Sequence, residues 1–135
     1  GLSLAAAAQS TGLAAWIGNL MPVGLSLILL VFMFTALIIF LTELTSNLAT
    51  TATFLPIVAI IATQFGFEPM LLTASIAIAA SCAFMLPVAT PPNAIVFGSE
   101  LIKVPQMMKA GIVINLIAIV IVSLAGIYLV PKFLI

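Results

Sequence analysis

Two short segments, residues 42–47 and 87–93, carry the polar side chains whose types and spacing could bind a small ion. In the first segment Thr42, Thr45 and Asn47 offer hard, neutral oxygen atoms, which are ligands that Na+ accepts. Backbone carbonyls of unwound chain, near Thr45 and at Ala89, could add to them. A shell of neutral oxygens suits a monovalent cation, so the sequence predicts a sodium site.

The same segments hold donors that could bind an anion. The side chains of Ser46, Asn47, Thr90 and Asn93 can donate hydrogen bonds to carboxylate oxygens, without a fixed arginine that would hold a divalent anion too tightly to release. Broken helices add free N–H groups at one end and free C=O groups at the other. These features together predict a site that binds an anion and a cation and releases both.

The residue types exclude several kinds of chemistry. The chain has no histidine, one cysteine (Cys82) and three carboxylates, so it offers neither a zinc cluster nor a nucleophile paired with a base. We therefore expect no enzyme, and we expect no nucleic-acid partner. Glu43 is open to two interpretations, a buried coupling acid or a charge that sits near an interface or pairs across a hairpin.

The elements that position these residues belong in a lipid bilayer. Residues 1–42, 44–67, 69–99 and 110–131 contain no Lys, Arg, Asp or Glu, and only 4% of the chain is charged while 65% is hydrophobic. A soluble domain needs roughly a quarter of its residues charged. The sequence predicts an all-α integral membrane protein.

The interruptions divide the chain into four expected parts. They are an interfacial helix over residues 1–22, a helical hairpin over 23–65 with its tip at 42–48, a broken helix over 69–102 with its break at 87–93, and a last transmembrane helix over 107–131. Three prolines place the break, since proline lacks an N–H, and we expect helix over residues 70–86 before it. Non-helical chain at membrane depth must line a cavity or be buried in protein.

The ends of the chain and its few lysines give weaker expectations. Lys103 and Lys109 predict a cytoplasmic loop, which would place the C-terminus outside the cell membrane of a multi-pass protein. The chain begins at Gly1 with no signal-peptide pattern, and we expect it to be part of something longer.

Two motifs carry a resemblance to a known family. Residues 80–96, ASCAFMLPVATPPNAIV, resemble the signature of the divalent anion/sodium symporter family almost residue for residue. Residues 42–51, TELTSNLATT, resemble the second of that family's two Ser-Asn-Thr hairpin-tip motifs, with Leu48 where many members have Thr. The resemblance covers essentially the whole chain.

The resemblance implies a fold and a function. The chain would be the C-terminal of two inverted repeats, with a re-entrant hairpin and a broken helix, and it would need the N-terminal repeat of the same protein, commonly in a homodimer. Ser46, Asn47, Thr90 and Pro91 would contact substrate. The sodium ion would lie among Thr42, Thr45, Asn47 and Ala89.

The function this implies is sodium-coupled symport of a divalent organic anion, a dicarboxylate such as succinate, or citrate. Two alternatives stay open. A neutral pocket does not choose between carboxylate and tetrahedral anions, so sulfate or another inorganic oxyanion is the nearest competing substrate. A channel-like or structural membrane subunit would use the same polar tips as gates or contacts, without ion coupling.

Overall fold

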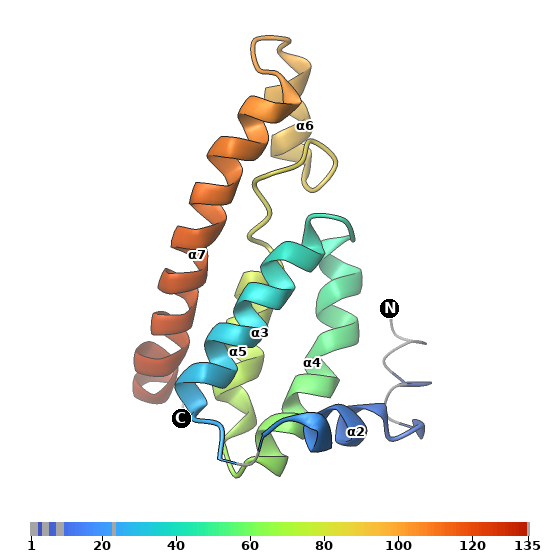
Figure 1. The fold of residues 1–135 in the computed structure, drawn as a ribbon, viewed down its shortest axis with the longest axis vertical. Coiled ribbons are helices and arrows are strands. Elements are labelled where there is room, and N and C mark those ends of the chain that lie inside the picture. The colour runs from blue at the N-terminus through green and yellow to red at the C-terminus, as the bar shows by residue number, and fades with distance from the viewer. Residues whose placement is uncertain (1–2, 4–5, 8–9, 23, 135) are drawn as a thin grey trace.

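The structure is a computed structural model that describes residues 3, 6–7, 10–22 and 24–134. All the regular elements in these residues are helices (Figure 1). They are α2 (Leu13–Leu20), α3 (Leu27–Thr42), α4 (Asn47–Gln64), α5 (Pro69–Ala79), α6 (Pro91–Gly98) and α7 (Val104–Phe133). The all-helical fold expected from the sequence agrees with this structure.

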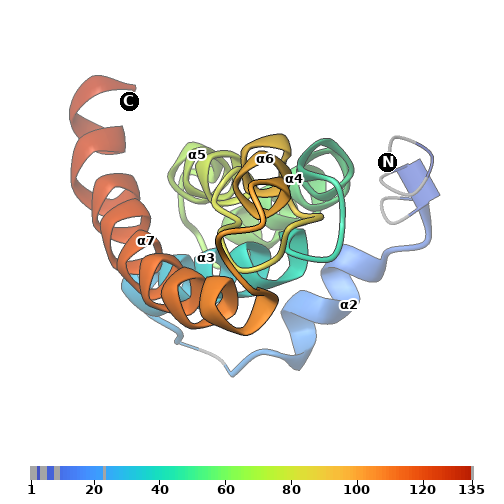
Figure 2. The ribbon, with the colours of Figure 1, turned by 90° about the horizontal axis from the view of Figure 1, so that it is seen from above.

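The core lies among α3, α4, α5 and α7. Helix α3 packs on α5 and α7, while α5 also packs on α4. The largest fully buried aliphatic side chains come from the first three of these helices, among them Leu30, Ile38, Ile61, Leu72 and Ile76. Seen from above, α7 runs along one side of the other helices (Figure 2).

The surface of α7 away from the core is apolar. Val113, Leu116, Ile117 and Ile121 are each about half exposed or more on this 30-residue helix. Helices α4 and α7 are long and apolar enough to cross a membrane. At 1.5 Å per residue α7 is about 45 Å long, which exceeds the ~30 Å of hydrocarbon in a bilayer.

Helix α2 lies within the range 1–22 where the sequence predicts an interfacial helix. It packs on α4, and the Gln64 Nε2 donates to Asn19 Oδ1 (2.6 Å). Residues 1–2, 4–5 and 8–9 of that expected helix lie outside the described residues.

The break in the broken helix differs from the expectation. Helix α5 ends at Ala79, seven residues before the expected end at Leu86, and α6 begins at Pro91. The unwound segment, residues 80–90, passes the connection between α3 and α4 before it reaches α6 (Figure 1). The expected break at 87–93 is therefore wrong at both ends. It starts earlier because tertiary hydrogen bonds satisfy the backbone of residues 83–86. It ends earlier because Pro91 and Pro92 occupy the first turn of α6, where no N–H is required.

Candidate functional site

The structure brings the hairpin tip and the end of the unwound segment together around one hollow. This hollow, which we call the tip hollow, has a volume of about 420 Å³, and its wall is mixed polar and apolar. Its lining residues are Glu43, Leu44, Thr45, Ser46, Asn47, Val88, Ala89 and Pro91. Five of the eight residues expected at the site therefore line one hollow. Thr42 and Thr90 adjoin these residues, and Asn93 is not among the lining residues.

The tip is held by its own small side chains. Ser46 caps α4, since its Oγ accepts from the Ala49 N–H (3.1 Å). The Thr45 Oγ1 donates to the Leu41 carbonyl (3.0 Å) and lies 2.6 Å from Thr50 Oγ1. These local bonds fix the four-residue connection between α3 and α4 and turn the first residues of α4 toward the hollow.

Three oxygen atoms converge beneath the tip. Thr42 is fully buried, and its Oγ1 lies 2.7 Å from Asn47 Oδ1 and 2.9 Å from the Ala80 carbonyl oxygen. One hydroxyl proton can be donated to only one of these two acceptors at a time. An oxygen cluster with too few protons is the chemistry a hard cation would satisfy, so these residues fit a sodium ion. The carbonyl that joins Thr42 is that of Ala80, while Ala89 lines the hollow above.

Hydrogen-bond donors that a ligand in the hollow could use come from α4 more than from α6. The side chain of Asn47 uses its Oδ1 within the described residues, which leaves its Nδ2 for a ligand. Helix α6 also begins at the hollow, but Pro91 and Pro92 lack an N–H, and the Asn93 N–H is 3.4 Å from Thr90 Oγ1. Thr90 accepts in that bond and keeps its own hydroxyl proton for donation.

Asn93, by contrast, is not available to a ligand. It is buried, and its Nδ2 donates to the carbonyls of Ala83 (2.8 Å) and Leu86 (3.0 Å). The expectation that Asn93 could bind a carboxylate is wrong, because both of its amide protons hold the unwound segment.

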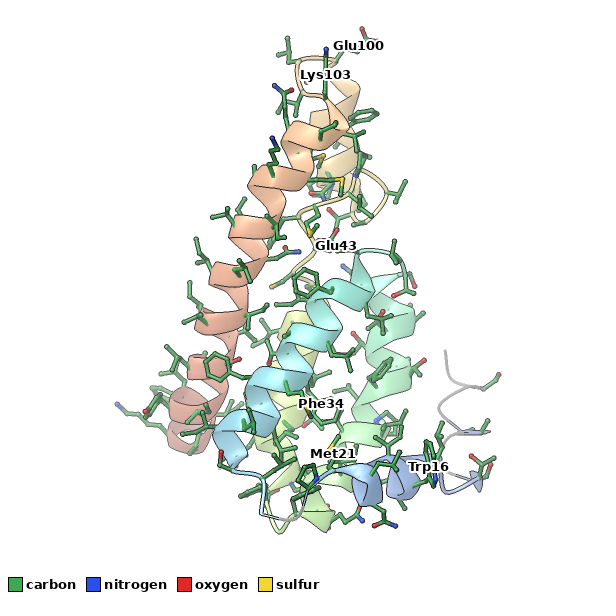
Figure 3. The ribbon with its side chains drawn as sticks, in the orientation of Figure 1. Trp16, Met21, Phe34, Glu43, Glu100 and Lys103 are labelled. Carbon is green, nitrogen blue, oxygen red and sulfur yellow. The ribbon has the colours of Figure 1, made fainter. Side chains whose placement is uncertain are left out.

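Glu43 also holds the unwound segment. Its Oε1 accepts from the N–H groups of Phe84 (2.8 Å) and Met85 (3.0 Å), and its Oε2 accepts from that of Leu86 (3.1 Å). The Asn115 Nδ2 of α7 donates to the same Oε1 (2.7 Å). Figure 3 shows Glu43 at the end of α3 beside the unwound chain. Glu43 is therefore buried, and its partners lie in the unwound segment and α7 rather than across the hairpin.

Two participants were missed by the sequence reasoning. The Ala80 carbonyl gives no signal in the sequence, because its position depends on where α5 ends. Asn115 could have been found, since it is the one amide in the charge-free residues 110–131, and a polar side chain in such a helix is expected to face a partner.

Helix ends that meet at a polar hollow beside unwound backbone are the arrangement that helical membrane transporters use. The chain matches the family model described as "Sodium:sulfate symporter transmembrane region" over residues 1–134, and it belongs to this family of membrane proteins. The resemblance to the divalent anion/sodium symporters is thereby confirmed. The family consists of transporters, which agrees with the expectation that the chain is no enzyme.

Two relatives carry a more specific name. The chain is 43% identical over 136 residues to a sodium-dependent dicarboxylate transporter of Staphylococcus saprophyticus, a match that covers 99% of this chain and 26% of the relative. It is 47% identical over 133 residues to the transporter of the same name in Staphylococcus aureus strain MRSA252, covering 97% of this chain and 26% of that relative. The chain therefore spans about a quarter of the length of these relatives.

Proposed function

We propose that this chain forms the C-terminal half of the binding site in a sodium-coupled symporter for a divalent organic anion, with a C4-dicarboxylate such as succinate as the first candidate and citrate as the second. The observation that carries the proposal is the tip hollow, where neutral oxygens for a cation and free donors for an anion meet at Asn47. The names of the two relatives support sodium and a dicarboxylate as the transported pair.

In this proposal Na+ is bound by oxygens of Thr42, Thr45 and Asn47 with the carbonyl of Ala89, and the Ala80 carbonyl is added to that set. Ser46, Asn47, Thr90 and Pro91 contact the anion. The bound Na+ supplies positive charge beside the anion, which would otherwise approach the negative Glu43 carboxylate. The remaining ligands come from the N-terminal repeat.

The contact between the hairpin tip and the unwound segment supports a re-entrant hairpin. Helix α3 has 16 residues and α4 has 18, so they are about 24 and 27 Å long, slightly less than the ~30 Å hydrocarbon core. They are joined by a polar connection, and Glu43 of this connection binds the unwound chain. We propose that the hairpin enters and leaves on one side of the cell membrane, that the chain is one of two inverted repeats in a homodimer, and that its C-terminus is extracytoplasmic.

Uptake by the full-length parent in proteoliposomes tests this function. Radiolabelled succinate and citrate are supplied with external sodium or with choline in its place, and radiolabelled sulfate is tested separately. We expect saturable uptake that requires sodium and that Asn47→Ala reduces to the level of empty vesicles. Thr73→Ala is the matched control, because among the described residues the Thr73 hydroxyl bonds its own helix alone, at Pro69 (3.0 Å), and its loss should not affect uptake.

Each other outcome has a clear meaning. Sodium-dependent uptake of radiolabelled sulfate, without uptake of either organic anion, would replace the dicarboxylate with an inorganic oxyanion. Flux that neither saturates nor requires sodium would indicate a channel. Near-normal uptake by Asn47→Ala would overturn the site assignment.

A further inference from the structure

Helix α7 reaches the unwound segment at two positions one helical turn apart. At Gly111 an added Cβ would overlap the backbone of Phe84 and Met85, so α7 and the unwound segment are in direct contact there. Four residues later, Asn115 is fully buried and donates to Glu43 Oε1. Residues at i and i+4 share one face of a helix, and this face of α7 therefore meets both the unwound segment and the side chain that binds it.

Asn115 is an unfavourable residue for packing alone. Its Oδ1 is buried and has no hydrogen-bond partner among the described residues. An unpaired buried carbonyl costs free energy that an aliphatic side chain of similar size would not cost. The hydrogen bond from Nδ2 to the charged Glu43 is the one interaction of this amide that a leucine could not replace.

Glu43 connects this bond to the candidate sodium site. It follows Thr42 directly, and Thr42 Oγ1 contacts the carbonyl of Ala80, the first residue of the unwound segment. The carboxylate binds the same segment at residues 84–86. All four donors to Glu43 are neutral, so its negative charge beside the oxygen cluster is not cancelled by an opposite charge among them. Because Thr42 and Glu43 both bind the unwound segment, a shift of this segment would move the Ala80 carbonyl relative to the hairpin tip.

We propose that Asn115 is a positioning residue: through Glu43 it fixes the unwound segment against the hairpin tip and thereby sets the affinity for sodium. The effect on sodium affinity rests on the proposed function. The positioning of the unwound segment by Asn115 does not depend on that function. Asn115 touches neither ion nor substrate. Its loss should affect the sodium concentration needed for transport rather than the rate at saturation.

The test uses Asn115→Leu and Asn115→Ser in the full-length parent. Leucine keeps the volume without the donor, and serine has a hydroxyl on a stem too short to replace the amide. Ser123→Ala is the matched control, because Ser123 is also a fully buried polar residue of α7 whose hydroxyl has no partner among the described residues. Succinate uptake is measured against sodium concentration at saturating succinate.

We expect both Asn115 variants to raise the half-saturating sodium concentration roughly tenfold, since a hydrogen bond to a charged group contributes about that factor. The maximal rate per folded transporter should be retained, and Ser123→Ala should match the wild type. A general folding defect would lower the amount of folded transporter and leave the half-saturating sodium concentration unchanged, and an unchanged half-saturating concentration in both Asn115 variants would overturn the proposal.

Hydrogen–deuterium exchange followed by mass spectrometry provides a second readout without transport. The amides of Phe84, Met85 and Leu86 should exchange faster in both Asn115 variants than in the wild type or Ser123→Ala, because their acceptor is less well held. Unchanged exchange would refute the positioning role. If the wild type shows no sodium-dependent uptake, the proposed function fails, and the exchange rates still decide whether Asn115 positions the segment.

Discussion

Gly111 gives the sharpest test of the contact between α7 and the unwound segment. In Gly111→Ala the new Cβ would lie 2.6 Å from the Phe84 carbonyl carbon, whereas carbon atoms in contact prefer about 3.5–4.0 Å. Either α7 or the unwound segment must therefore move by about 1 Å. The obstacle is backbone, which cannot rotate away as a side chain could. Overpacking of this kind costs about 1–3 kcal/mol.

Gly98→Ala is the matched control for this substitution. Gly98 lies at the end of α6, and an added Cβ there would meet nothing within 4 Å. Both substitutions favour helix by up to about 1 kcal/mol, because alanine has the higher helix propensity. The difference between the two variants therefore reports the overlap at Gly111, separated from the propensity term.

The assay is the thermal unfolding midpoint of the purified full-length parent in one detergent at one scan rate, since such unfolding is often irreversible. We expect the midpoint of Gly111→Ala to lie a few degrees below that of Gly98→Ala. An equal or higher midpoint for Gly111→Ala would show that α7 does not press on residues 84–85, and the close approach would then be wrong.

Two further predictions concern the tip. Thr42→Val keeps the shape of the side chain and removes the hydroxyl. In uptake measured against sodium concentration, the half-saturating concentration should rise roughly tenfold with the maximal rate retained. An unchanged half-saturating concentration would remove Thr42 from the cation site. Ser46→Ala removes the cap of α4 and a donor to the anion, so it should lower stability by about 1 kcal/mol and also raise the KM for succinate. Ser26→Ala, which removes the cap of α3 far from the hollow, should lower stability without changing KM, and a KM change common to both variants would contradict the contact.

The sequence predicted the helical membrane fold because its signals are local. Charge-free runs longer than a span, a polar tip between them and prolines after an apolar helix can be recognised without knowing which residues meet. The residues that converge on the tip hollow were found for the same reason, since Thr45, Ser46 and Asn47 are adjacent in sequence and Ala89 and Pro91 belong to the proline motif.

The start of the unwound segment could not be predicted in this way. Residues 70–86 contain neither proline nor glycine, and their propensities favour helix. The helix ends at Ala79 because Glu43 accepts from three N–H groups and Asn93 donates to two carbonyls, which together replace the bonds a helix would make. These partners lie 41–43 residues upstream and 7–10 residues downstream. A local sequence pattern carries no information about the bonds to Glu43, because Glu43 lies outside the segment.

Asn47 provides a physical route by which the cation could control the anion. Its Oδ1 faces the cluster at Thr42, so the opposite end of the amide is left for the hollow. A sodium ion bound at the cluster would require the amide oxygen on its own side and would fix the N–H groups toward the anion, whereas the single Thr42 proton is shared between Asn47 and Ala80 and constrains the amide less. Sodium binding would then precede and strengthen anion binding. Thr42→Val should accordingly weaken succinate binding at low sodium and leave it intact when sodium is saturating.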